Sequence, residues 1–406
     1  MTTARQIFQR QTLQEALGSN CFGVKIFESL LKNKEWLTVC LYPDYFNFMN
    51  PDYRPTALNV FAELDADELS RLKHQNNTLF MFNYSWEGTS YKEYNFWEML
   101  TCSGLRHNIP AEKIFFISSN LKEEEQYDIW QKENFPNYRI NVIGIDSFSN
   151  YSAQYLQFLN HYTIDHAINT IREKHKLFLS MNRRVRTMRV YTIYKIFESR
   201  IFENTMISYD QLELNHIVRA HPSIRMGKNI NPDTYKRLID SSPAVLDFSN
   251  FNDNWAGSPT EAAMPVSLFE KSLISLVSET LFDTYDSTSL FYSEKSFKPM
   301  IYYHPIMIFG QPGLNTSLEQ IGFKNYSNYF DLSFDTIEDH VSRIDAQIAQ
   351  LEILNDKLSC MNADQRVDWA MQDRFTLEYN REVLQAQDFN KKKLQKLIDI
   401  VKSITE

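Results

Sequence analysis

The chain has 406 residues, 23% of them charged and 43% hydrophobic, and its 42 basic and 51 acidic side chains give a net charge of −9. This composition is typical of globular proteins and excludes wholesale disorder. No two of the ten glycines are two residues apart, which excludes a G-x-G-x-x-G dinucleotide turn, and Val24 stands where the lysine of a P-loop would follow Gly23.

The first half of the chain alternates short apolar runs with amphipathic segments. Buried strands are predicted at 78–83, 113–119 and 139–145, and a crossover helix at 123–133. Residues 38–42 form a further candidate strand, although three prolines soon follow it. The repeated strand–helix order predicts an α/β domain with a parallel sheet.

The second half repeats this pattern after a helix predicted over 162–174. Four further apolar runs are strand-like, at 177–180, 244–248, 273–278 and 306–309. Helices are predicted at 187–199, at 334–354 and near the end of the chain, where apolar residues recur every three or four positions.

These two halves predict an α/β protein with two Rossmann-like domains that face a central cleft, closed by C-terminal helices. The predicted boundaries are 1–165 for an acceptor-binding domain, 166–370 for a nucleotide-sugar-binding domain and 371–406 for helices that pack back across both. Because ligands of open parallel sheets bind beyond the carboxyl ends of the strands, site residues are expected just after the strands.

The cysteine pattern and the apolar runs predict the compartment. Four cysteines at 21, 40, 102 and 360 form no C-x-x-C pair, so we expect reduced thiols rather than a disulfide framework or zinc site. The first residues have no apolar signal region, and no run approaches ~18 apolar residues. A cytoplasmic protein without a transmembrane segment is therefore expected.

The richest polar segment comes after the strand predicted at 273–278. Glu279 follows that strand, and Glu294, Lys295 and Lys298 lie at the expected start of a short helix. Lysines beside the unpaired N–H groups of a helix start can hold a diphosphate, and the carboxylates can accept hydrogen bonds from sugar hydroxyls. The alternative is a solvated helix start whose charges pair in water.

A second segment contains four arginines within seven residues, at positions 183, 184, 186 and 189. It runs from a strand end into a helix, and such a cluster is costly unless an anion neutralises it. A phosphate site is therefore one interpretation, and a basic surface loop is the other.

Together these segments resemble the donor-binding motif of the α-1,3-fucosyltransferases. The resemblance covers about 140 residues and rests on Glu279, the Tyr-Ser-Glu-Lys run at 292–295, Pro305, Gly310 and an upstream loop from Asn182 to Arg189. It implies a GT-B fold, a GDP-sugar donor, inversion at the anomeric carbon and no obligatory metal. By position, Arg189 and Lys295 would bind the diphosphate, Glu279, Tyr292 and Glu294 would contact sugar and ribose, and Asn182 and Lys298 would complete the donor site.

The first half provides the candidate general base. Glu87 follows the strand predicted at 78–83, and Trp86 beside it could stack on a sugar. A carboxylate near the acceptor hydroxyl can remove its proton. Asp146, after the strand predicted at 139–145, is the competing residue, and the alternative for Glu87 is a surface-loop carboxylate.

Other chemistries lack their motifs. The nine histidines show no metal-ligand spacing, and there is no G-x-S-x-G elbow, so neither a zinc hydrolase nor an α/β-hydrolase is indicated. The sequence therefore predicts a metal-independent glycosyltransferase without a bound cofactor. Its donor would be a nucleotide sugar and its acceptor a glycan or other hydroxyl-bearing molecule. The alternatives are transfer to a modified nucleic-acid base, which the acidic charge disfavours, and a non-catalytic carbohydrate- or nucleotide-binding protein.

Overall fold

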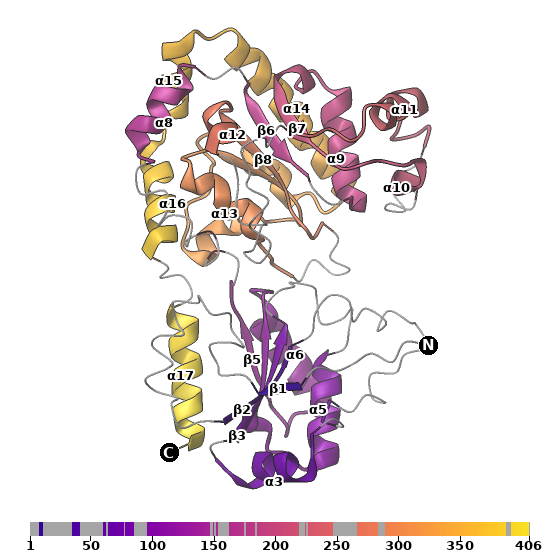
Figure 1. Ribbon diagram of the computed structural model, residues 1–406, viewed down its shortest axis with the longest axis vertical. Helices are drawn as coiled ribbons and strands as arrows, with labels where there is room; N and C mark the ends of the chain where they lie inside the picture. The colour runs from indigo at the N-terminus through magenta and orange to yellow at the C-terminus, as the bar shows by residue number, and fades with distance from the viewer. Residues whose placement is uncertain are drawn as a thin grey trace. The chain divides into compact units, whose positions relative to one another are not determined.

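The structure is a computed structural model that separates into two compact units (Figure 1). Unit 1 comprises Met1–Asn150, Thr284–Phe291 and Gln387–Glu406, and unit 2 comprises Tyr151–Asp283 and Tyr292–Ala386. The residues that the structure describes are 8–10, 35–40, 60–61, 64–76, 78–84, 96–146, 149, 152, 162–173, 176–182, 185–218, 224, 226–246, 266–282, 289–386 and 391–405.

Unit 1 contains a five-stranded sheet in which four strands are parallel. The strands are β1 (Phe8–Arg10), β2 (Glu35–Cys40), β3 (Thr78–Tyr84), β4 (Ile114–Ser118) and β5 (Asn141–Gly144), in that spatial order, with β1 antiparallel to β2. The strands predicted near 78–83, 113–119 and 139–145 are thus confirmed, and so is the crossover helix, α6 (Glu123–Asn134).

The side chains of β3 alternate between two apolar layers. Phe80 and Phe82 pack in a cluster with residues of α3 (Ala66–His74), α5 (Phe96–His107) and α6. Leu79 and Met81 point to the other face, where helix α17 (Lys391–Thr405) contributes Leu397, Ile398 and Val401. A parallel sheet buried on both faces explains why its strands are nearly continuous apolar runs.

Unit 2 contains a four-stranded, wholly parallel sheet. Its strands are β6 (Phe178–Met181), β7 (Thr205–Ser208), β8 (Ile274–Ser278) and β9 (Ile306–Phe309), in the spatial order β7-β6-β8-β9. The α/β class predicted from the sequence is confirmed, because both units are built on sheets of mainly parallel strands with helices between them.

Helices surround the sheet of unit 2 (Figure 1). They are α8 (Ile164–Ile171), α9 (Thr187–Glu198), α10 (Leu214–Val218), α11 (Pro232–Asp240), α12 (Val266–Glu270), α13 (Glu294–Ile301), α14 (His340–Ser359), α15 (Ala363–Ala370) and α16 (Arg374–Ala386). The domain boundaries drawn from the sequence, after residues 165 and 370, stay predictions, since compactness alone does not delimit folding domains.

Two sequence predictions for unit 2 need correction. The helix predicted at 334–354 begins only at His340, because Asp339 caps it by accepting a hydrogen bond from Ser342 N (2.8 Å). The strand predicted at 244–248 is wrong in its described part, where Ala244 forms only an isolated bridge to Tyr209 and Val245 is 73% exposed. None of the helices described combines the length and apolarity needed to cross a bilayer.

Candidate functional site

The carboxyl ends of β6 and β8 meet where the strand order of unit 2 reverses. From β6 the chain continues to β7 on one side, whereas β8 and β9 lie on the other. In an open parallel sheet, ligands bind in the crevice outside such a reversal. Hydrogen bonding continues one residue beyond each of these two strands. Asn182 N, after β6, donates to Ser208 O of β7 (3.0 Å), and Glu279 N, after β8, donates to Phe309 O of β9 (2.8 Å). This edge is the candidate site.

Arg189 lies in the first turn of α9, which follows β6, and its side chain reaches the end of β8. The residue is 3% exposed, and Nη2 donates to the carbonyl oxygens of Ser278 and Glu279, each at 3.3 Å. Helix α9 has no acidic residue in its first turn and no side-chain cap at Arg186. Positive side chains at the positive end of a helix dipole are unfavourable, so an anion bound here would stabilise this end. Arg183 and Arg184 lie outside the described residues.

Glu279 joins the end of β8 to the start of α13. Its side chain is fully buried, and Oε1 accepts hydrogen bonds from Ser293 N (3.0 Å) and Ser296 Oγ (2.6 Å). Oε2 accepts a third bond, from Thr280 N (3.0 Å). These bonds fix where α13 begins relative to the sheet. The predicted contact of Glu279 with sugar or ribose stays a prediction.

The start of α13 carries a compact group of charges, as the sequence predicted. Ser293 caps the helix and also accepts a hydrogen bond from Lys295 Nζ (3.1 Å), which pairs with Glu294 Oε1 at 2.8 Å. Burial would raise the pKa of Glu294, but the charges of Lys295 and Lys298 outweigh it, and the pKa falls below its usual 4.5. The carboxylate is therefore ionised at neutral pH, and two lysines accompany it and the carboxyl group of Glu279 at this helix start.

The remaining two predicted donor-site residues are buried. Lys298 is 3% exposed, one turn after Lys295 in α13. Tyr292 is 2% exposed, and its hydroxyl donates to Leu314 O at 2.7 Å. This places the Tyr292 ring in the packed layer beneath the start of α13, with its hydroxyl bonded to the backbone. Its contact with the donor stays a prediction.

Serines complete this edge, and the sequence analysis did not single them out. Ser293 precedes a Glu-Lys helix start, which is a readable capping signal. Ser296 binds Glu279 from a position that only the three-dimensional arrangement reveals. Gly310, just after β9, also matters, because a Cβ there would lie 3.2 Å from the Cβ of Glu279.

The candidate bases of the first half belong to unit 1. Glu87 and Trp86 lie outside the described residues. Asp146 follows β5 and is 4% exposed, and its Oδ1 accepts a hydrogen bond from Ser149 N at 3.2 Å. The role of each carboxylate as a base stays a prediction.

A carboxyl group that the sequence analysis missed opens helix α6. Glu123 is fully buried, and its Oε2 accepts a hydrogen bond from Ser118 Oγ at 3.2 Å, at the end of β4. Burial raises the pKa of Glu123 to about 8, against the lowering effect of hydrogen bonds from Asn120, Ser118 and Trp97. The group can therefore hold a proton near neutral pH. A glutamate at a helix start directly after a buried strand was the available signal.

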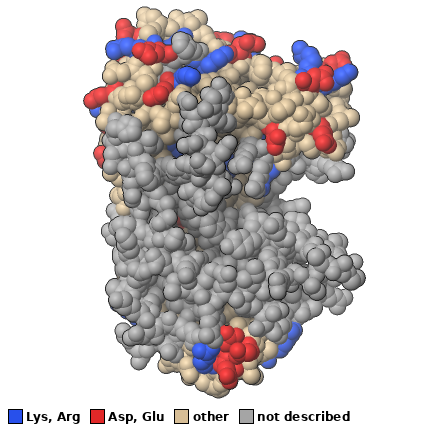
Figure 2. Space-filling model, in the orientation of Figure 1, with Lys and Arg blue, Asp and Glu red and all other residues tan. Residues whose placement is uncertain are grey.

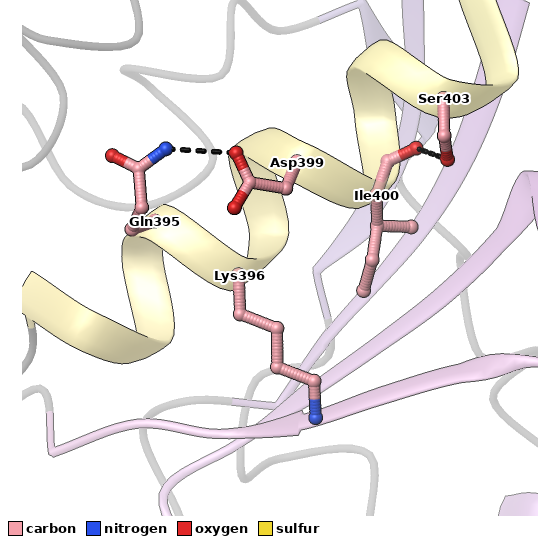
Figure 3. Close-up of a pocket in the computed structure, with 5 residues that line it drawn as sticks. All are labelled: Gln395, Lys396, Asp399, Ile400 and Ser403. Atoms are coloured by element: carbon pink, nitrogen blue, oxygen red, sulfur yellow. Dashed lines mark hydrogen bonds between the residues drawn. The ribbon is translucent and has the colours of Figure 1, made fainter.

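Two surface depressions are lined by other residues, one in unit 1 and one in unit 2. One, of about 470 Å³, lies along α17 and is lined by Gln395, Lys396, Asp399, Ile400 and Ser403 (Figure 3). Its polar groups bind each other, since Gln395 Nε2 donates to Asp399 (2.8 Å) and Ser403 Oγ to Ile400 O (2.7 Å).

The other depression, of about 400 Å³, is lined by residues of α9, α11 and the 227–231 turn, with Asp345. Lys195 pairs with Glu198 (3.2 Å) and Asp345 (3.3 Å) there. Neither depression contains a residue of the candidate site.

Metal-ligand side chains do not gather at one place in the described part of the chain. Within it, no three His, Cys, Asp or Glu side chains are placed to hold a metal ion together. On the face in Figure 2, described basic and acidic side chains of unit 2 lie beside one another. This mixture differs from the single basic stripe that is typical of nucleic-acid-binding surfaces.

Comparisons with known proteins add little to this geometry. No protein-family model matches the chain, and no curated protein matches its sequence. Among solved structures, the chain is similar to alpha,alpha-trehalose 6-phosphate synthase from Burkholderia multivorans, at 10% sequence identity and a TM-score of 0.33. The match covers 82% of this chain and 73% of that one. Similarity at this TM-score establishes neither a fold family nor an activity.

Proposed function

We propose that this protein is a glycosyltransferase that moves a sugar from a nucleoside-diphosphate sugar, preferably a GDP-sugar, to an acceptor hydroxyl on a glycan. One observation carries the proposal. A buried arginine and a lysine-bearing helix start lie at the carboxyl edge of two neighbouring parallel strands, where their order reverses.

The charges at this edge suit a diphosphate. Arg189 lies at the end of β8, Lys295 and Lys298 lie in α13, and the start of α9 has no side-chain cap, so an anion can accept from its first N–H groups. Two carboxyl groups, of Glu279 and Glu294, lie at the same edge as these three positive side chains. The resemblance of 292–295 and of the Asn182–Arg189 loop to α-1,3-fucosyltransferases supports GDP as the nucleotide and inversion as the outcome.

The proposed reaction is a direct displacement. A carboxylate takes the proton of the acceptor hydroxyl while its oxygen attacks the anomeric carbon. The bond from that carbon to the diphosphate oxygen breaks, and the diphosphate leaves with the electron pair. Arg189 and Lys295 stabilise its negative charge, which is largest in the transition state. Glu87 is the proposed base, and Asp146 is its competitor.

The test is ligand-dependent melting of the wild type and of Lys295→Ala. We expect GDP, among GDP, UDP, CMP and dTDP, to stabilise the wild type, by about 2.7 kcal/mol at 100 times its dissociation constant. Lys295→Ala should fold, because Glu294 keeps the charge of Lys298 nearby, although with lower stability than the wild type, and it should lose the stabilisation by GDP. Lys271→Ala is the matched control, since Lys271 is an exposed lysine that precedes β8 at its amino end.

Each result has a defined meaning. A wild type that none of the four nucleotides stabilises would overturn the donor site. Binding of GDP without transfer from, or hydrolysis of, any GDP-sugar would instead favour a non-catalytic binding protein. Equal GDP binding by Lys295→Ala and Lys271→Ala would remove Lys295 from the site.

A further inference from the structure

Two buried polar side chains after β6 and at the end of β8 each have one atom without a hydrogen-bond partner in the described part of the structure. Ser278 is 1% exposed, and its Oγ has no hydrogen-bond partner. Asn182 is 2% exposed, and its Nδ2 donates to Ser180 Oγ (3.0 Å) while its Oδ1 has no partner. If the amide is turned over, Oδ1 binds Ser180 and the nitrogen loses its partner instead. One amide atom therefore stays unpaired in either orientation.

The sheet register brings these two side chains to the same level and the same face. The last pair of the β6–β8 ladder is Leu179 with Ser275, and counting three residues further along each chain in the same register sets Asn182 level with Ser278. Residues opposite each other in a parallel pair point to the same face. The ladder bond from Asn182 N to Ser208 O keeps Asn182 extended beyond the end of β6.

Ser278 also lies beside the proposed diphosphate-binding arginine, because Arg189 Nη2 donates to its carbonyl oxygen (3.3 Å). Buried polar atoms in native proteins are nearly always hydrogen-bonded, and leaving one unpaired costs about 1–3 kcal/mol. Two at one edge, next to an arginine, indicate that a ligand supplies the missing partner.

We propose that Ser278 and Asn182 together bind one hydroxyl group of the donor, and this inference rests on the proposed glycosyltransferase function. A hydroxyl both donates and accepts, so it can donate to Asn182 Oδ1 and accept from Ser278 Oγ at once. With Asn182 Nδ2 bonded to Ser180, a phosphate oxygen, which only accepts, would leave Asn182 Oδ1 unpaired. A hydroxyl suits either orientation of the amide, because it can donate to the oxygen or accept from the nitrogen. The hydroxyl belongs either to the ribose or to the transferred sugar.

The first experiment is the free energy of unfolding of two serine variants of the same strand. Ser278→Ala removes a buried hydroxyl without a protein partner, so the variant should be at least as stable as the wild type. Ser275→Ala should be less stable, because Ser275 Oγ is bonded to His304 Nδ1 at 3.1 Å. Equal destabilisation in the two variants would overturn the proposal, since Ser278 would then have a partner within the protein.

The second experiment is binding of GDP and GDP-fucose to the same variants. Ser278→Ala should lose about 5- to 10-fold in affinity, the value of one neutral hydrogen bond, and Ser275→Ala should not. A loss with both ligands identifies a ribose hydroxyl, and a loss with GDP-fucose alone identifies a hydroxyl of the sugar. Unchanged affinity for both ligands would overturn this inference while leaving the proposed function standing. A wild type that binds neither would overturn both.

A double variant tests whether a single hydroxyl is shared. When two residues bind the same group, their losses are not additive. Ser278→Ala with Asn182→Ala should therefore lose clearly less affinity than the product of the two single losses. Fully multiplicative losses would show two separate contacts and overturn the shared hydroxyl.

Discussion

The guanidinium group of Arg189 donates a hydrogen bond to the carbonyl oxygen of Glu279 across 3.3 Å. This bond joins the first turn of α9 to the residue whose side chain holds the start of α13. The two helices at the carboxyl edge of the sheet are therefore fixed through one arginine–glutamate pair, and Arg189 has a structural role beside its proposed electrostatic one.

Arg189→Ala should lower both stability and GDP affinity. The residue is 3% exposed, and its loss removes the hydrogen bonds of a charged group to the carbonyl oxygens of Ser278 and Glu279, which predicts a loss of about 2–4 kcal/mol in urea denaturation. Arg200→Ala is the control, because that side chain is 63% exposed and its pair with Asp356 should contribute less than about 1 kcal/mol. A fully stable Arg189→Ala protein would contradict the structural role.

Glu123→Gln should change how stability depends on pH. The folded state raises the pKa of Glu123 to about 8 from 4.5, so it binds this proton more tightly than the unfolded chain does. The resulting stability is fully present below pH 4.5 and is lost as pH rises through about 8. The wild type should therefore lose stability relative to Glu123→Gln over that range, as measured by urea denaturation at several pH values.

The control for this pH series is Glu125→Gln, because Glu125 is exposed on the same helix. Its stability should run parallel to that of the wild type. Parallel curves for Glu123→Gln as well would show that Glu123 titrates alike in the folded and unfolded states.

Glu87→Gln should lower transfer by roughly 10²–10⁴ while GDP affinity is retained, because a general base acts only on the acceptor. Asp146→Asn provides the comparison, since Asp146 is the competing carboxylate after β5. Single-turnover rates with bound GDP-sugar would measure the difference. Near wild-type transfer by Glu87→Gln, with a large loss in Asp146→Asn, would reassign the base to Asp146.

Chelation should leave donor binding and transfer intact, because arginine and lysine side chains are proposed to neutralise the diphosphate. Transfer rates in excess EDTA, with and without added Mg²⁺ or Mn²⁺, would measure this. A complete loss that either metal restores would point to a metal-bridged diphosphate and would contradict the proposed role of the basic residues.

The sequence predicts strands in which apolar residues follow one another, and it misses the half-buried edge strand β7. Strands β3, β4 and β9 each contain four consecutive apolar residues, and β8 has three among five, which makes them readable. Strand β7 was missed because Thr205–Ser208 lies at an edge and is mostly half-buried, so its residues need not be apolar. The apolar run at 244–248 was wrongly predicted to be a buried strand, because Val245 is apolar but exposed.

For the candidate site, the residues could be predicted better than their partners. The charged segments that follow two predicted strands identified Arg189, Glu279 and Lys295. The structure places these residues at one edge of one sheet. Strand order, however, cannot be read from periodicity, and the reversal between β6 and β8 follows from pairing alone. The bond from Ser296 to Glu279 and the register of Asn182 with Ser278 depend on that pairing, so they required the structure.

The discontinuity of unit 1 has a consequence for synthesis on the ribosome. The face of its sheet that contains Leu79, Met81 and Phe115 packs against Leu397 and Val401 of α17. These strands leave the ribosome first, and their covering helix is translated more than two hundred residues later, after all of unit 2. During that interval the nascent chain exposes an apolar sheet face, a state that favours aggregation or chaperone binding. A gene fragment that stops after residue 150 would leave the same face exposed permanently, and we expect it to be insoluble.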